Sequence, residues 1–331
     1  MNKIILLDLK MANDGHRAAY AAFLSRLFDL ERMGFGWKAL SSKLPVLVPM
    51  IEESFGGYFV ACLIRSLFGR RTVGFLFRPR PVLEASSARL RIKYLALRFL
   101  LLLPKVKTLT ILPFSVDPRF SEIADGWIYD PQFWDLDEQQ RSAFRNVSNE
   151  LADKIQVMAA GRRVCSAIGR QDRSKGFDWF ARLFSQNSEL RKSMLFAFGG
   201  KVDAACVESE ASLSSAGGFA CNRFISDEEL LAFYANADLI WCAYSKDYDQ
   251  ASGILGRAVQ LGIPAVVRKG SLIQKLCELE GFAHVAIDDT ADGSTLMSSL
   301  PRTSSEDVSS RVHRMQEISL KTLRSSLGVA T

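Results

Sequence analysis

The stretch DLIWCAYSKDYDQASGILGRAVQLGIPAVVRKG, from Asp238 to Gly270, decides the fold. Asp238 to Tyr244 is a short apolar run of buried-strand length, and Lys246 to Ser252 is a polar loop. Gly253 to Leu261 has the apolar spacing of a helix, after which a Gly-Ile-Pro turn leads into a second strand. Strand, loop, helix and strand in this order predict half of a doubly wound parallel sheet, in which ligands bind at the carboxyl ends of the strands.

The polar loop of this stretch predicts an anion site. The loop follows the first strand and leads into the helix that starts at Ser252, Gly253 and Ile254. A helix N-terminus carries a positive partial charge and unpaired N–H groups, which suit a phosphate. We therefore expect Ser252, Gly253 and Ile254 to face a phosphorylated ligand.

Length and composition indicate a two-domain globular protein. The chain has 331 residues, of which 48% are hydrophobic and 24% charged. Its six cysteines are scattered without a Cys-x-x-Cys pair, so we expect free thiols in a reducing compartment. No secretory signal is visible at the N-terminus, and the apolar run ALRFLLLLP is about half the length of a membrane span. These observations predict a cytoplasmic protein.

The first half of the chain alternates between strands and helices. We expect strands at 3–9, 45–49, 71–77, 107–112 and 126–129, and helices at 16–30, 57–67 and 86–103. A polar helix at 135–158 follows. This order predicts an open parallel sheet with helices on both faces, in a domain that spans residues 1–150.

A second alternating series follows the break at 159–163. We expect strands at 163–169, 194–198, 218–224 and 284–287, with helices at 176–188, 204–215 and 272–281, in addition to the opening stretch. Another helix should begin at Ser226, because Glu229 stands three residues later as in a capping box. The second domain should span residues 160–310, and residues 311–331 should form a terminal helix.

Basic residues gather in one segment of the first half. Residues 65–107 hold eleven Lys and Arg against one acid, whereas the whole chain has a net charge of +6. A solvated helix face explains such an excess, and so does a face for an anionic membrane or a phosphorylated lipid. Nucleic acid is not expected as a partner, because no nucleic-acid motif accompanies the charge.

A second candidate loop lies at Gly169 to Gly176, GRQDRSKG, between a predicted strand and a predicted helix. Arg170 offers a bidentate guanidinium and Lys175 a point charge, and both groups suit a diphosphate. A surface turn with two solvated cations is the alternative.

Together the two loops resemble the C-terminal domain of retaining glycosyltransferases of the GT-B fold, particularly family 4. That family has Gly-Arg, four residues and Lys-Gly, then a helix of the form deel…yy..ad, a loop with two glutamates eight positions apart, and a Gly-x-Pro turn. Here Asp227 to Leu230, Tyr234 and Ala237-Asp238 match the helix, and Gly262-Ile263-Pro264 match the turn. The resemblance covers about 164–270 and implies an α/β fold of two Rossmann-like domains facing each other across a cleft.

The resemblance also implies roles for single residues. Arg170 and Lys175 would hold the donor diphosphate, and Gly15 would let the first loop approach the phosphates. His16, which follows the first predicted strand, is a catalytic candidate; a purely structural position at the start of a helix is its alternative.

The two glutamate positions are where this chain departs from the family. They carry Asp249 and Arg257. Asp249 keeps a carboxylate, so the resemblance implies a catalytic or donor-sugar contact there. Arg257 cannot accept hydrogen bonds from ribose hydroxyls, so it either pairs with a neighbouring acid or meets a phosphate of the donor nucleotide.

No metal or other cofactor is expected. Asp247-Tyr248-Asp249 has the Asp-x-Asp form that binds a divalent cation in the other large glycosyltransferase fold, but here it follows a strand of a Rossmann-like domain. Arg170 and Lys175 would supply the positive charge that a metal supplies there.

These features predict a glycosyltransferase, specifically a hexosyltransferase, that uses a nucleotide-diphosphate sugar as donor. The expected acceptor is a saccharide or a lipid-linked saccharide in surface polysaccharide biosynthesis, with retention of configuration and peripheral binding to the inner membrane face as further hypotheses. Two alternatives stay open: a non-catalytic nucleotide-sugar-binding protein and a GT-B-fold epimerase.

Overall fold

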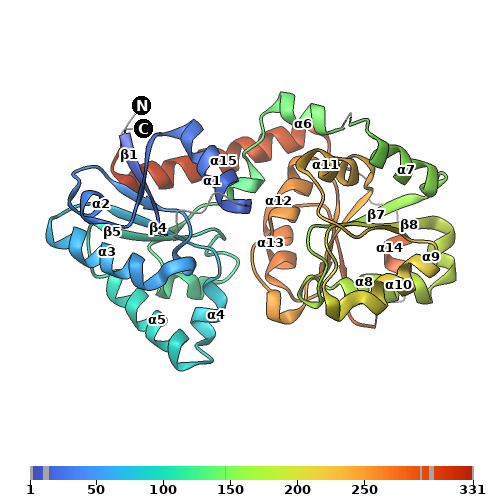
Figure 1. The fold of residues 1–331 in the computed structure, drawn as a ribbon, viewed down its shortest axis with the longest axis horizontal. Coiled ribbons are helices and arrows are strands. Elements are labelled where there is room, and N and C mark those ends of the chain that lie inside the picture. Colours follow the sequence, from blue (N-terminus) through green and yellow to red (C-terminus); the bar gives the residue numbers. More distant parts are fainter. Residues whose placement is uncertain (1–2, 10–14, 146, 291–292, 298–301, 330–331) are drawn as a thin grey trace. The chain divides into compact units, whose positions relative to one another are not determined.

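The chain forms two units, each with its own parallel sheet (Figure 1). The computed structural model describes residues 3–9, 15–145, 147–290, 293–297 and 302–329, without the side chains of residues 15–19 and 145. Unit 1 comprises residues 1–131 and 314–331, and unit 2 comprises residues 132–313. The predicted α/β fold of two Rossmann-like domains is confirmed.

Unit 1 is built on six parallel strands in the order β2-β1-β3-β4-β5-β6. The strands are β1 (Lys3–Asp8), β2 (Asp29–Gly34), β3 (Val46–Val48), β4 (Thr72–Leu76), β5 (Val106–Thr110) and β6 (Gly126–Trp127). The helices are α1 (Gly15–Leu27), α2 (Trp37–Ser41), α3 (Phe55–Leu67), α4 (Pro79–Glu84) and α5 (Ala88–Leu100), with short 3-10 turns η1 (Ile51–Ser54) and η2 (Pro118–Glu122).

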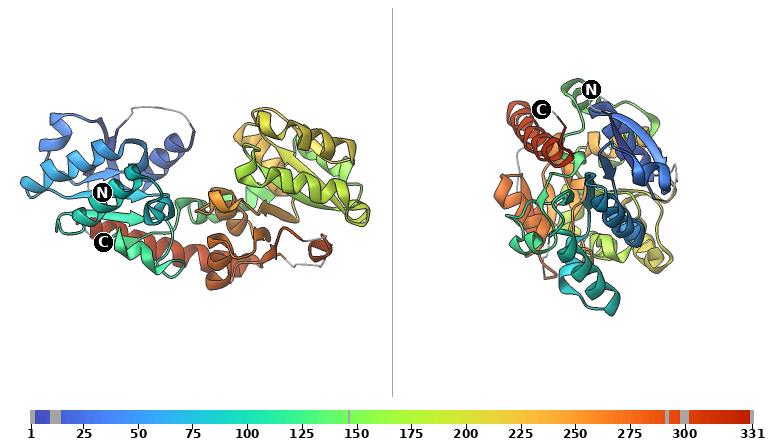
Figure 2. Two further views of the ribbon diagram at one scale, coloured as in Figure 1. Left: turned by 90° about the horizontal axis from the view of Figure 1, so that it is seen from below. Right: turned by 90° about the vertical axis from the view of Figure 1, so that its left-hand side faces the viewer.

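Unit 2 has six parallel strands in the order β12-β11-β10-β7-β8-β9, with helices on both faces of the sheet (Figure 2). The strands are β7 (Arg163–Ile168), β8 (Met194–Gly199), β9 (Phe219–Cys221), β10 (Leu239–Cys242), β11 (Ala265–Arg268) and β12 (His284–Ile287). The α-helices are α6 (Glu138–Arg145), α7 (Glu150–Ala159), α8 (Phe177–Gln186), α9 (Ser188–Ser193), α10 (Val207–Ser215), α11 (Asp227–Asn236), α12 (Gly253–Gln260), α13 (Leu272–Glu280) and α14 (Ser294–Met297). Short 3-10 turns are η3 (Pro131–Phe133), η4 (Arg173–Lys175), η5 (Ala204–Cys206) and η6 (Lys246–Tyr248).

The division between the units differs from the predicted one. Unit 2 begins at Gln132 rather than near residue 160, because α6 and α7 contact α11 of the second unit. The chain ends in the helix α15 (Ser305–Leu327), which belongs to unit 1 from Arg314 onward. There Ser319 is fully buried and its Oγ accepts the backbone N–H of Tyr129 at 3.0 Å.

Strand β2 was not predicted. Its sequence, DLERMG, lacks the apolar run of a buried strand, and its first two residues fall within the helix predicted at 16–30. The strand lies at the edge of the sheet, where polar side chains reach water, and pairs in parallel with β1 from Lys3↔Asp29 to Asp8↔Gly34.

Arg65 changes the interpretation of the basic segment. Its side chain is fully buried in unit 1, and its guanidinium donates to the carbonyls of Ala39 at 2.7 Å and Leu44 at 2.7 Å and to Oγ1 of Thr72 at 3.1 Å. Burial lowers the pKa of Arg65 to about 10. Arg65 therefore ties α3 to α2, to the loop before β3 and to the start of β4, and it is not part of a charged surface.

An aromatic cluster fills the core of unit 2 between β7, β8, β10 and α8. The ring centroids of Phe180 and Phe196 lie 4.6 Å apart, and Trp241 lies 5.2 Å from Phe180 and 5.5 Å from Trp179. All four residues are buried, and large buried rings contribute much of the apolar area removed from water. This cluster holds β10 and α8 rigidly below the loops that follow β7 and β10.

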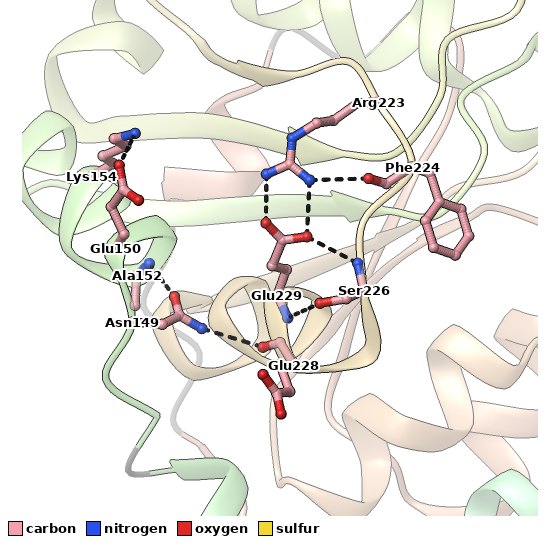
Figure 3. A network of polar contacts seen from close by, with 9 residues as sticks. All are labelled: Asn149, Glu150, Ala152, Lys154, Arg223, Phe224, Ser226, Glu228 and Glu229. Atoms are coloured by element: carbon pink, nitrogen blue, oxygen red, sulfur yellow. Dashed lines mark hydrogen bonds and ion pairs between the residues drawn. The ribbon is translucent and has the colours of Figure 1, made fainter.

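Helix α11 begins with the predicted capping box, which the structure confirms (Figure 3). Ser226 Oγ accepts the backbone N–H of Glu229 at 3.2 Å, and the Glu229 carboxylate accepts the backbone N–H of Ser226 at 3.0 Å. Arg223 adds a bidentate pair to the same carboxylate, and Asn149 links the start of α7 to the carbonyl of Glu228. These contacts anchor the helix that precedes the stretch from Asp238 to Gly270.

We expect acid to weaken this anchor through Glu229. The hydrogen bonds from Arg223 and Ser226 lower the pKa of Glu229 from 4.5 to about 2. Its contribution to stability is therefore complete above pH 4.5 and is lost as the pH falls toward about 2. Urea unfolding followed across this window should show a smaller loss of stability for Glu229→Gln than for the parent protein. Glu228→Gln is the matched control, and its free energy of unfolding should fall with pH as steeply as that of the parent. If the free energy of Glu229→Gln falls as steeply as that of the parent, the assignment is contradicted.

Candidate functional site

The strand order of unit 2 brings the two candidate loops together. Strand β7 lies between β10 and β8, so the chain leaves β7 toward one side of the sheet and later returns on the other side. This reversal is the switch point at which open α/β sheets bind ligands. Residues 169–176 follow β7 and residues 243–252 follow β10, so both loops lie at the carboxyl edge of the switch point.

The first loop is shaped by glycines and by one aspartate. Gly169 has φ +90°, and its carbonyl accepts the side-chain amide of Gln171 at 2.8 Å. Oδ1 of Asp172 accepts the backbone N–H of Lys175 at 2.9 Å, which closes the single turn η4 before α8. The loop is thus a rigid turn that presents Lys175 at its end.

The two loops are in direct contact. The backbone N–H of Ser245 donates to the carbonyl of Ser174 at 3.0 Å. Gly176 has φ +71°, and a Cβ at this position would lie 2.2 Å from the carbonyl oxygen of Ala243. Only glycine fits both the backbone angle and this approach. The two loops therefore meet at Lys175-Gly176, the Lys-Gly pair of the sequence motif.

The contact between the loops places Lys175 against two tyrosine rings. Its Nζ lies 4.3 Å from the ring centroid of Tyr244 and 4.2 Å from that of Tyr248. Within the described residues no carboxylate lies within 4.0 Å of Nζ, so no ion pair competes with a ligand for this group. Burial raises the pKa of Tyr244 well above its ordinary value, so this ring stays neutral. The sequence analysis identified Lys175 but not Tyr244 and Tyr248. Two aromatic residues four positions apart at this loop were a signal that a cation could be bound there.

Helix α12 begins next to Tyr244, one of the two tyrosines that contact Lys175. Ser252 is 3% exposed, and its Oγ lies 2.8 Å from the hydroxyl of Tyr244 and caps the backbone N–H of Leu255 at 3.3 Å. The amides of Gly253 and Ile254 belong to the first turn, which has no acceptors within the helix. A Cβ at Gly253 would overlap Oε1 of Gln132, so the Gln132 side chain lies directly against the start of this helix.

Asp249 holds the second loop in place. Its Oδ1 accepts the backbone N–H of Leu272 at 2.8 Å, and its Oδ2 pairs with the guanidinium of Arg268 at 3.2 Å. Arg268 also donates from Nε to the carbonyl of Tyr244 at 2.9 Å. The Asp249 side chain is only 2% exposed. In this structure the carboxylate predicted to meet the donor sugar anchors the loop to β11 and α13, and Arg268 is a residue that the sequence did not single out.

Arg257 pairs with a neighbouring acid, which was one of its two predicted alternatives. Its guanidinium binds the carboxylate of Asp135 through two bonds, of 2.9 and 3.1 Å. Gln260 donates to the same carboxylate at 2.8 Å and to the carbonyl of Gln132 at 2.7 Å. Arg257 therefore fastens the segment that begins unit 2 onto α12, and both charges are balanced within the protein.

Arg170 is the exposed cation of the site, with 69% of its side chain accessible. It forms ion pairs with Asp203 and, at 3.6 Å, with Asp172. An ion pair exposed to water contributes little to stability, so a ligand anion can replace the carboxylates at little cost. Arg170 and Lys175 lie in the same loop, as the motif predicted.

Gly15 and His16 belong to unit 1. Helix α1 begins at Gly15, and the side chain of His16 lies outside the described part of the structure. Their predicted roles at the donor phosphates and in catalysis stay predictions.

The described residues hold neither a metal cluster nor a helix that could span a membrane. No three His, Cys, Asp or Glu side chains there come together as ligands of a metal ion. In the same part of the chain no helix is long and apolar enough to cross a membrane.

Comparison with solved structures shows which fold this architecture belongs to. Anabaena HepE in complex with UDP aligns with a TM-score of 0.64 and 13% identity, over 98% of this chain and 100% of that chain. Sucrose-phosphate synthase from Thermosynechococcus elongatus aligns with a TM-score of 0.62 and 11% identity, over 98% of each chain. The UDP-forming trehalose-phosphate synthase from Burkholderia xenovorans gives 0.58 and 12%, over 87% of this chain and 74% of that chain.

These similarities confirm the predicted GT-B fold. No protein-family model matches the sequence, and no curated protein matches it either. At these identities the likeness lies in the fold alone.

The junction at Gly176 can be tested with a pair of glycine substitutions. Gly176→Ala combines an unfavourable positive φ with overlap on the Ala243 carbonyl, so we expect a loss of about 2–4 kcal/mol in the free energy of unfolding. Gly161 is the matched control: its φ is +82°, but a Cβ there meets nothing within 4 Å. Gly161→Ala should cost only about 1 kcal/mol. Equal losses in urea unfolding would show that the two loops are not in close contact.

Proposed function

We propose that this protein is a glycosyltransferase that takes its sugar from a nucleotide-diphosphate donor bound by unit 2. The observation that carries the proposal is the ammonium of Lys175, which lies against the rings of Tyr244 and Tyr248, with Tyr244 next to the start of α12. A cation and free backbone amides at a switch point form a site for a diphosphate. HepE of Anabaena, which has the same fold, has been solved with UDP and with UDP-glucose.

The same groups suit the chemistry of sugar transfer. When the bond between the sugar and the diphosphate breaks, negative charge develops on the leaving diphosphate. Lys175, the exposed Arg170 and the amides of Gly253 and Ile254 would stabilise that charge without a metal ion. A loop that is rigid before the ligand arrives needs no rearrangement during the reaction, which increases this effect.

The finer features of the proposal follow from the sequence resemblance. We propose transfer of a hexose, with retained configuration, to a saccharide or lipid-linked saccharide in surface polysaccharide assembly. Asp249 stays a candidate for the donor sugar, although in this structure it anchors the second loop. Arg257 is committed to Asp135, so we propose that another group contacts the ribose.

The diphosphate assignment can be tested with three variants of one loop. Arg170→Ala and Lys175→Ala should each lower turnover by about 10²-fold or more, because each removes positive charge from the leaving group. Arg173→Ala is the matched control, since Arg173 is an exposed cation of the same loop for which no role is proposed. Release of the nucleotide from a donor sugar measures turnover, and circular dichroism confirms folding. Normal transfer by both variants would refute the assignment.

A panel of nucleotide sugars separates this proposal from its two rivals. Release of the free nucleotide with a new glycoside indicates a transferase, whereas a new nucleotide-sugar isomer indicates an epimerase. Binding without any product indicates a non-catalytic binding protein.

We also propose that α5 meets an anionic membrane surface. On this helix and the turn after it, Ile92, Leu95 and Leu102 are 68%, 64% and 75% exposed, at spacings of three and seven residues that place them on one side. The exposed Arg91 and Arg98 flank this side. An exposed apolar stripe bordered by cations is typical of helices that lie in the interface of an anionic bilayer.

Flotation with vesicles tests the membrane proposal. The parent protein should bind vesicles containing about one third phosphatidylglycerol more strongly than neutral vesicles at low salt, because its cations attract anionic lipid. The triple variant Ile92→Ser, Leu95→Ser, Leu102→Ser should lose most of this binding. Val157→Ser removes an equally exposed apolar side chain from α7 of unit 2 and should bind as the parent does. No preference for anionic lipid would remove the proposal.

A further inference from the structure

Unit 1 carries an exposed surface at the amino edge of its sheet, opposite to the carboxyl ends where such sheets bind ligands. Helix α2 leads into β3, α3 into β4 and α5 into β5, and these three strands are parallel neighbours. The turns that precede them therefore lie side by side. Helix α3 also contacts both α2 and α5 (Figure 1). We call the exposed residues of these helices and turns the amino-edge surface: Trp37, Lys38, Lys43, Leu67, Phe68, Leu102 and Lys105.

Large apolar side chains of this surface are open to solvent. Leu67 is 87% exposed and Trp37 65%. The ring of Trp37 meets that of Phe68 edge-on, with the centroids 6.1 Å apart, so α2 and the end of α3 form one apolar patch. Leu102, in the turn before β5, joins this patch to the exposed stripe of α5. Exposed apolar residues that gather in this way mark a surface that a partner covers.

The segments that form this surface contain cations and no acids. Residues 35–45, 64–71 and 99–105 hold no Asp or Glu, and their cations are Lys38, Lys43, Arg65, Arg70, Arg71 and Lys105. Among these cations, and within the described residues, only Lys38 lies within 4.0 Å of a carboxylate, that of Glu31 at 3.6 Å. The surface is therefore positive as well as apolar.

The buried guanidinium of Arg65 fixes the turns beneath this surface. It donates to the carbonyls of Ser42 at 3.2 Å and Leu44 at 2.7 Å, in the turn before β3, and to that of Arg71 at 3.0 Å, before β4. Carbonyl groups satisfy the hydrogen bonds of a guanidinium but leave its net charge in place. The exposed side chains therefore stand on turns that are ordered before any partner binds.

The combination of groups restricts the partner. A soluble polyanion would pair with the lysines but would leave Trp37 and Leu67 in water. An apolar protein surface would cover those two side chains but would offer nothing to the lysines. An anionic bilayer supplies both, with phosphates at the level of the ammonium groups and acyl chains below them. Tryptophan is enriched at this interface because its ring is apolar and its N–H is polar.

We propose that the amino-edge surface docks onto an anionic bilayer, with its apolar side chains among the upper acyl chains and its lysines at the lipid phosphates. The inference extends the membrane contact proposed for α5 to a separate set of residues and does not need the transferase. Membrane affinity grows with the apolar area inserted and with the number of cations near the headgroups, so the two surfaces reinforce each other. The carboxyl edge of the sheet is left open.

Fluorescence quenching by vesicles containing brominated phosphatidylglycerol tests the inference at one residue. Trp37 is the exposed tryptophan, whereas the other four are buried or half-buried. The emission of the parent protein should fall with brominated vesicles and not with vesicles of the unbrominated lipid. Trp37→Phe should lose most of this quenching, because the inserted fluorophore is gone, and should still float with the vesicles, because phenylalanine also inserts.

Flotation measures what the apolar side chains contribute. The double variant Trp37→Ser, Leu67→Ser should bind vesicles with about one third phosphatidylglycerol about fivefold or more weakly than the parent, because less apolar area is inserted. The double variant Val157→Ser, Val207→Ser removes two exposed apolar side chains from α7 and α10 of unit 2 and should bind as the parent does. Thermal unfolding shows that each variant is folded.

A second pair of variants measures the contribution of charge. Lys38→Gln combined with Lys43→Gln should weaken binding to the anionic vesicles about fivefold or more at low salt, since each cation near the headgroups adds to the attraction. Lys154→Gln combined with Lys192→Gln removes the same charge from exposed positions of unit 2 and should leave binding unchanged.

The outcomes separate this inference from the other proposals. Vesicle binding without quenching of Trp37, or parent-like binding by both amino-edge double variants, would overturn it and leave the contact of α5 in place. Retention on soluble polyglutamate that the lysine variants abolish, without vesicle binding, would also overturn it and indicate an acidic protein partner. Absence of binding to every vesicle would remove both membrane proposals and leave the transferase proposal intact, because release of the nucleotide is measured without membranes.

Discussion

The candidate site of unit 2 depends on the close approach of two backbones at Gly176 and Ala243. A glycine in the left-handed region lets the turn after β7 lie against the carbonyl end of β10, and the bond between Ser245 and Ser174 joins the loops. The aromatic cluster below holds β10 and α8 in register. Because both loops are rigid at their bases, Lys175 and the start of α12 are already in place for a ligand.

The charges of the site differ in what remains available to a ligand. Asp249 and Arg257 are largely buried, and each forms an ion pair within unit 2. An unpaired charge in such a position would cost free energy. Lys175 instead faces two aromatic rings, which partly stabilise a cation without neutralising it. The ion pairs of Asp249 and Arg257 thus stabilise the loops, whereas the ammonium of Lys175 remains available to a ligand.

Unit 1 shows the same contrast. Arg65 is fully buried, and its guanidinium is satisfied by carbonyls and a hydroxyl, which makes it a structural tie. Glu52 and Lys93 line the same cavity without forming an ion pair, and Oε2 of Glu52 has no hydrogen-bond partner, unlike the guanidinium of Arg65. Buried polar atoms without a hydrogen-bond partner are uncommon in folded proteins.

The sequence by itself determined the fold class, the loop after β7 and the capped start of α11, because strands, glycine turns and caps are local patterns read from neighbouring residues. It did not determine β2, an edge strand without an apolar run, nor the return of α15 to unit 1. Nor could it show that Tyr244 and Tyr248 contact Lys175, that Arg257 meets Asp135, or that Glu52 lies near Lys93. These pairs are separated by tens to more than a hundred residues, and only the packing of strands and helices brings such side chains together.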